Sequence, residues 1–178
     1  MWPIGPLMHE HRLIERMLKV VEKRLEAFRE GQGDPVFVEQ VVGFVRTYAD
    51  RCHHGKEEDI LFRDLAARGL GEGLRKTMEE LLEEHRQARQ MVGRLDAANR
   101  RYQAKDKAAL AEVIEVLQWL ASFYPQHIAK EDKGFFYPCM ELFSKEEKDA
   151  MLAEFWEFDR KLVHEQATKQ VEDMEAGA

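Results

Sequence analysis

Apolar residues recur at intervals of three and four along nearly the whole chain, and strict alternation of apolar and polar residues is rare. The first such segment begins near Leu7 and stops at Gly31, where a glycine-containing turn interrupts the pattern. This spacing places the apolar side chains on one face of an α-helix. The pattern therefore predicts an all-α fold in which each helix packs through one apolar face.

The same pattern predicts three further long helices. Asp34 is a typical N-cap, and the helix that follows it is expected to end before Gly69. The third helix is expected after Gly73, and the fourth near Asp106. Because the connections are short, we expect residues 1–143 to form an antiparallel, up-down-up-down four-helix bundle.

An additional amphipathic helix is expected in the C-terminal residues 144–178. Ser144 followed by Glu147 has the pattern of a capping box at a helix start. The apolar residues of this helix are Met151, Leu152, Phe155, Trp156, Phe158 and Leu162. Two arrangements remain open, because this surface can pack across the bundle or form the interface of a homodimer.

The second half of the bundle repeats the first at an offset of 74 residues. The repeated pairs of possible metal ligands are His11 with His85, His53 with His127, and Glu57 with Glu131. These residues fall on the core faces of the predicted helices. Counting from each turn at ~1.5 Å per residue places the four histidines at one height in the bundle.

This repeated set predicts one shared site for two metal ions. Buried carboxylates need a compensating cation, and each glutamate can bridge two ions while the histidines bind from the sides. Without metal, burial is expected to raise the pKa of both glutamates. Nitrogen and oxygen ligands suit iron, with zinc or manganese as alternatives. The predicted metal ligands are His11, His53, Glu57, His85, His127 and Glu131.

The remaining histidines have other expected places. His9 points away from the apolar face that carries His11, and His164 lies outside the repeat, so both are expected at the surface. His54 is about 100° from His53 on an α-helix, and its role as a flanking ligand is left open. The carboxylates that can accept the second N–H of a ligating ring are Glu10, Glu84 and Asp50.

Composition narrows the possible partners. The chain has 178 residues, 44% of them hydrophobic, which is enough for one domain with a buried core. A net charge of −7 argues against a nucleic-acid partner. The chain shows two cysteines, no leader pattern and no apolar run of 18 or more residues, so we expect a cytoplasmic protein with no membrane partner.

The segments that carry these residues resemble the hemerythrin-like, or HHE cation-binding, family. The resemblance spans residues 4 to about 143, and the motifs that carry it lie in residues 7–11, 52–62, 84–85 and 127–136. It implies that the six residues of the repeat hold a non-haem di-iron centre. The oxygen carriers of the family place two histidines four residues apart on the third helix, whereas His85 has Leu81 and Arg89 at those positions. In these oxygen carriers the last metal ligand is an Asp, which lies one residue further along the chain than the position of Glu131 here.

Three functions fit these observations. The leading hypothesis is a di-iron protein that binds or senses oxygen, nitric oxide or a related small oxidant. The alternative is a di-iron redox enzyme that turns over peroxide or nitric oxide, or repairs iron centres. Only Tyr124, Glu58 and His54 are placed to act as its acid-base group. In a third interpretation the metals, zinc included, only stabilise the bundle.

Overall fold

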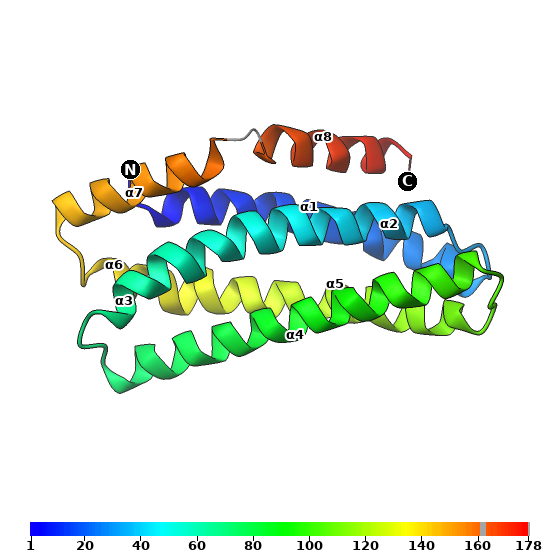
Figure 1. The fold of residues 1–178 in the computed structure, drawn as a ribbon, viewed down its shortest axis with the longest axis horizontal. Helices are drawn as coiled ribbons and strands as arrows, with labels where there is room; N and C mark the ends of the chain where they lie inside the picture. Colours follow the sequence, from blue (N-terminus) through cyan, green and yellow to red (C-terminus); the bar gives the residue numbers. More distant parts are fainter. Residues whose placement is uncertain (161–162, 178) are drawn as a thin grey trace.

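The computed structural model describes residues 1–160 and 163–177, and every regular element in that part of the chain is a helix. The prediction of an all-α fold is therefore confirmed. The first helix, α1, spans Ile4–Arg29 and is followed by Gly31, whose φ of 82° suits a residue without a side chain. Figure 1 shows the long helices lying side by side in an elongated molecule.

The second helical run begins at Asp34, whose side chain accepts hydrogen bonds from two backbone N–H groups as an N-cap. The run starts as α2 (Pro35–Phe44) and ends as α3 (Arg63–Ala66). Between them lie two π-helical segments, η1 (Val45–His54) and η2 (Glu57–Phe62). Segments of this kind are rare and lie frequently at functional sites.

The second pair of long runs packs against the first. The helix α4 spans Glu72–Gln103, and α5 spans Ala109–Lys130 beside it. The last run continues as the π-helical segment η3 (Glu131–Phe135) and the short helix α6 (Phe136–Met140). In the first His-x-x-x-Glu motif, His53 and Glu57 both lie in π-helical segments, whereas in the second His127 lies in α5 and only Glu131 lies in a π-helical segment.

The C-terminal part contains two helices where the sequence predicted one. They are α7 (Lys145–Asp159) and α8 (Val163–Ala176). The capping box is confirmed, because the Ser144 side chain accepts from the Glu147 backbone N–H while the Glu147 carboxylate accepts from the Ser144 backbone N–H. Figure 1 shows both helices beside α1.

The apolar side chains of α7 divide between the core and the surface. Met151 and Phe155 are buried in the core of the same chain, so this part of α7 packs against the bundle. Trp156 and Phe158 are exposed by 56% and 36%. Leu162, which was expected on the apolar face, lies outside the described residues. The homodimer stays a prediction.

A layer of buried polar residues separates two apolar clusters. The larger cluster is formed by α1, α2, η1, α4, α5 and α8. The smaller one is formed by the starts of α1 and α4 with η2, α3, η3, α6 and α7. The polar residues buried in the layer are Glu10, His11, His53, His54, Lys56, Glu57, His85, His127 and Glu131. No helix in the described part of the chain is long and apolar enough to cross a membrane.

Candidate metal centre

The structure brings all six predicted ligands together in this layer. Each of the six is at most 2% exposed to solvent. They come from every long helical run: His11 from α1, His53 from η1, Glu57 from η2, His85 from α4, His127 from α5 and Glu131 from η3. Their side chains form two groups that share the glutamates.

The first group combines two imidazoles with both carboxylates. Ligand atoms of His11, His53, Glu57 and Glu131 all lie within 4.8 Å of one another. The Nε2 atoms of the two histidines are 2.9 Å apart. Four side chains that direct donor atoms into one such space can surround a single cation.

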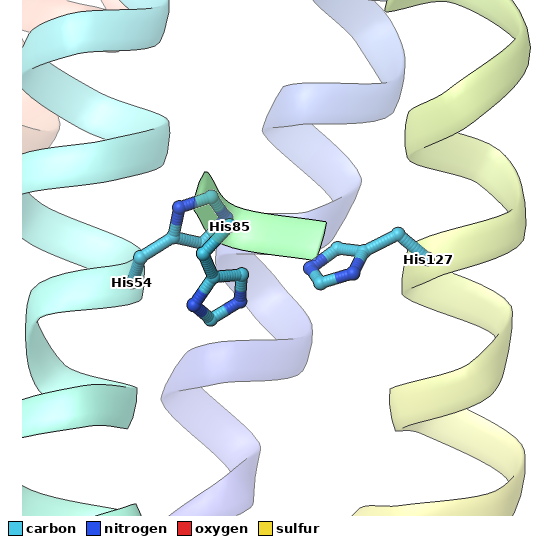
Figure 2. Close-up of side chains that lie close together, drawn as sticks. All are labelled: His54, His85 and His127. Carbon is cyan, nitrogen blue, oxygen red and sulfur yellow. The ribbon is translucent and has the colours of Figure 1, made fainter. Parts of the chain in front are cut away.

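The second group contains three imidazoles, one more than predicted. Ring nitrogens of His54, His85 and His127 lie within 4.8 Å of one another. Figure 2 shows the three side chains reaching into the space between η1, α4 and α5. The His54 ring is only 1% exposed and stacks on His85 with the ring centres 3.8 Å apart.

Sequence reasoning left His54 out of the predicted ligand set, with its role open, for two reasons. On an α-helix it would point away from His53, whereas the wider turn of η1 reduces the angle between neighbours and lets both rings face the core. The repeat also places Ile128 at the corresponding position, so a search for repeated ligands passes over it. The signal that could have found it is the adjacent His-His pair itself.

The two carboxylates connect the two groups. The Oε1 atom of Glu57 lies 3.5 Å from His53 Nε2, and its Oε2 lies 3.4 Å from His85 Nε2. The Oε2 atom of Glu131 lies 3.1 Å from His11 Nε2, and its Oε1 lies 3.3 Å from His127 Nε2. Each glutamate thus directs one oxygen to each histidine group.

The buried donor atoms at this centre fit a cation. Within the described residues, eleven buried side-chain polar atoms have no hydrogen-bond partner, and seven of them are here. They are both oxygens of Glu57, both oxygens of Glu131, and the Nε2 atoms of His54, His85 and His127. Unpaired buried acceptors of this kind are unfavourable unless something binds them, and a metal ion satisfies imidazole nitrogen and carboxylate oxygen together.

Four outer carboxylates orient the rings of the candidate ligands. Each accepts a hydrogen bond at 2.7–2.8 Å from the Nδ1 atom of one histidine, in the pairs Glu10 with His53, Asp132 with His11, Glu58 with His85, and Glu84 with His127. A proton held on Nδ1 leaves Nε2 free to bind metal. Glu10 and Glu84 were predicted, whereas Glu58 and Asp132 were missed, although they too are separated by 74 residues.

Burial and nearby charges shift the pKa values of the ligands in opposite directions. Burial, followed by the charge of His11, lowers the pKa of His53 to about 4. Burial and the charge of Glu131 raise the pKa of Glu57 well above its ordinary value. Burial also acts to raise the pKa of Glu131, but His127, His11 and His85 outweigh it and hold that pKa well below its ordinary value. The predicted increase is therefore confirmed for Glu57 and wrong for Glu131.

The two outlying histidines differ from each other. His9 is exposed, as predicted. His164 is half-buried, with 33% of its side chain exposed, and its Nε2 lies 2.9 Å from an oxygen of Asp159. The contact joins the end of α7 to the start of α8, and the sequence did not indicate it because one continuous helix was predicted there.

A small cavity adjoins the second group. Its volume is about 110 Å³, and His54 and Tyr124 form part of its lining together with an ion pair between Asp50 and Arg89. The Tyr124 hydroxyl is buried and has no hydrogen-bond partner among the described residues. The cavity is large enough for a molecule of a few atoms.

The helical fold and the buried imidazoles and carboxylates are typical of cation-binding helical proteins. The model of the hemerythrin HHE cation-binding domain matches residues 3–139. Because this match covers more than half of the chain, the protein belongs to that family. No curated protein and no solved structure matches the chain.

Proposed function

We propose that this protein is a non-haem di-iron protein that binds oxygen, nitric oxide or a related small oxidant. The observation that carries the proposal is the orientation of Glu57 and Glu131, each of which directs one oxygen to each histidine group. One ion would need only one of these groups. When bound, iron would supply the redox chemistry that the binding of oxygen, nitric oxide or a related oxidant requires.

The residues that would hold the two ions form unequal sets. His11 and His53, with one oxygen from each glutamate, supply four donor atoms to the first position. Three imidazoles, from His54, His85 and His127, and the two other carboxylate oxygens supply five to the second. The outer carboxylates hold the rings in place and keep a proton on each Nδ1 atom that they contact.

The proposal includes the predicted antiparallel, up-down-up-down order of the four long helical runs. The connections between them are short, at residues 30–34, 67–71 and 104–108. Short connections of this length favour antiparallel neighbours.

A di-iron redox enzyme is the second candidate. The observation that favours it is the Tyr124 hydroxyl, which lines the cavity beside His54. Burial raises the pKa of Tyr124, so the phenol stays protonated and can donate a hydrogen bond or a proton to a small molecule in the cavity.

Anaerobic loading with ferrous iron tests both candidates. We expect about two iron ions per chain, and visible absorption that changes when oxygen or nitric oxide is added. Loading with zinc serves as the control, because a zinc form has no such absorption. A ratio near one, or spectra unaffected by either gas, would contradict the proposal. Steady turnover of added peroxide would favour the enzyme over the binding protein.

A further inference from the structure

A completely buried lysine links the metal centre to the C-terminal helices. Lys56 is 0% exposed, and its Nζ atom lies 2.7 Å from both carboxylate oxygens of Asp159, the last residue of α7. The same ammonium group donates to Oε1 of Glu10. A lysine is rarely buried in this way unless its charge is paired, and here two carboxylates pair it.

The link continues to a predicted metal ligand. The other oxygen of Glu10 accepts a hydrogen bond from Nδ1 of His53 at 2.8 Å. At the opposite end, Asp159 also contacts Nε2 of His164 in α8 at 2.9 Å. A chain of direct polar contacts therefore runs from the His53 ring through Glu10 and Lys56 to both C-terminal helices.

The second half of the repeat contains the same lysine, glutamate and histidine contacts, but the described residues of α7 and α8 do not cover them. Lys130 donates to Glu84, which accepts from Nδ1 of His127 at 2.7 Å, as Lys56 and Glu10 do at His53. Lys130 is 31% exposed, and its second carboxylate, Glu80, is 46% exposed. The first half of the centre thus has a buried lysine held by α7, and the second half has an exposed one.

The sequence also differs between the two halves where α7 docks. A Cβ atom at Gly55 would lie 2.8 Å from Cζ of Phe158 in α7, which is closer than real Cβ contacts. The corresponding position in the second half is Ala129. The absence of a side chain at Gly55 therefore lets α7 approach the segment that carries His53.

We propose that α7 and α8, docked through Lys56 and Asp159, hold His53 in its ligating orientation and so control how tightly the metal at His11 and His53 is retained. Lys56 and Asp159 are positioning residues, which act on the metal through Glu10 and His53. Because such coupling is reciprocal, bound metal also holds the two helices more tightly on the bundle. This inference rests on the proposed function, since it requires metal at the first position.

The repeat supplies a matched pair of variants to test it. Lys56→Met with Asp159→Leu removes the buried link, and Lys130→Met with Glu80→Leu removes the exposed counterpart. In the first variant we expect one of the two ions to pass to a chelator about 10-fold faster than in the unchanged protein, at the lower end of the ~10- to 100-fold effect of losing an orienting partner, because Glu10 itself is retained. In the second we expect less than about a twofold change, because exposed ion pairs contribute little. Equal acceleration in both variants would overturn the inference.

Hydrogen exchange on the unchanged protein gives an independent readout, which stands even if the first variant does not fold. We expect the backbone amides of α7 and α8 to exchange more slowly with metal bound than without it. We expect the Lys56→Met, Asp159→Leu variant to lose this difference. Exchange in α7 and α8 that is the same with and without metal in the unchanged protein would overturn the inference.

These measurements distinguish failure of the inference from failure of the proposed function. The metal ratio of the unchanged protein is determined first, and a ratio near two supports the di-metal centre whatever the C-terminal helices do. If that ratio holds and the two double variants release metal at the same rate, the centre stands and the link to α7 and α8 is refuted.

Discussion

His54 alone makes the two histidine groups of the centre unequal in their number of imidazoles. With it, the second histidine group has three imidazoles, whereas the first group has two. The corresponding residue in the other half of the repeat is Ile128, which is buried and 3% exposed. The same place in the fold therefore accepts either an apolar residue or a candidate metal ligand, and this chain has one of each.

Replacing His54 by isoleucine, the residue of the repeat, should remove one donor without introducing a charge. We expect the metal content after dialysis to fall from about two ions towards one, because the second position keeps only His85 and His127 as imidazole ligands. Metal analysis measures the loss. His9→Ala is the control, since His9 is exposed and should keep its full content. An unchanged metal content in His54→Ile would mean that this ring is a core residue only.

At the scale of helices, local signals predicted much of the fold. The Asp34 cap, the Ser144 capping box and the apolar faces are encoded within a few neighbouring residues, and the structure contains them all. The π-helical segments were not predicted, because apolar spacing of three and four does not reveal a wider turn. No glycine or proline marks the end of α7 at Asp159, so one C-terminal helix was predicted instead of two.

The candidate site also contains residues that the sequence predicted and residues that it did not. The duplicated ligands were found because duplication is visible in the sequence, and helix geometry placed them at one height. His54 has Ile128, not a histidine, at its counterpart in the repeat, and the role of Lys56 depends on Asp159, which is 103 residues away in the chain. Contacts between residues so far apart in the chain form only when the helices pack, and no local sequence pattern predicts them.

Gly55→Ala tests the close approach of α7. The added Cβ atom forces the Phe158 ring to move, and we expect faster amide hydrogen exchange in α7 with a loss of about 1 kcal/mol of stability, since overpacking at a partly exposed ring lies at the low end of its usual effect. Ala129→Gly is the control. It should cost a similar amount through helix propensity but leave exchange in α7 unchanged. Equal exchange in both variants would mean that Gly55 does not set the docking of α7.

At the scale of the whole molecule, stability depends on what occupies the polar layer. Without metal, the unpaired oxygens of Glu57 and the mutually facing imidazoles lie between two well-packed apolar clusters. In the metal-free protein, protons bound to these side chains replace part of the positive charge that metal ions would supply. Metal removal should therefore leave a helical protein whose stability responds strongly to pH.

The metal-free protein should lose stability as pH rises from 6.5 to 9. Burial opposes protonation of His11, but Asp132 and Glu131 outweigh it and raise its pKa to about 9, against about 6.5 in the unfolded chain. A folded pKa that is raised gives stability that is complete below the unfolded pKa and is lost as pH passes the folded one. The raised pKa of Glu57 acts in the same direction. For His11 the loss is about 3 kcal/mol.

Thermal melts at pH 6, 7.5 and 9, with chelator and with metal, measure this effect. We expect the metal-free midpoint to fall by roughly 6–12 °C over this range. The metal-bound form should show no such fall, because its ligands are already deprotonated. His11→Gln should reduce the slope of the metal-free form. A metal-free midpoint that rises with pH would show that His11 is not held as an imidazolium.

The unequal number of donors at the two metal positions has a consequence for how the protein fills. In the proposed di-iron centre, one position has five donor atoms and the other has four, so the two positions would differ in affinity even without cooperativity. We expect scarce iron to produce chains that carry a single ion at the richer position. If two ions form the proposed centre, a chain with one ion would lack the second redox partner, so iron supply would determine whether one-electron or two-electron chemistry is available.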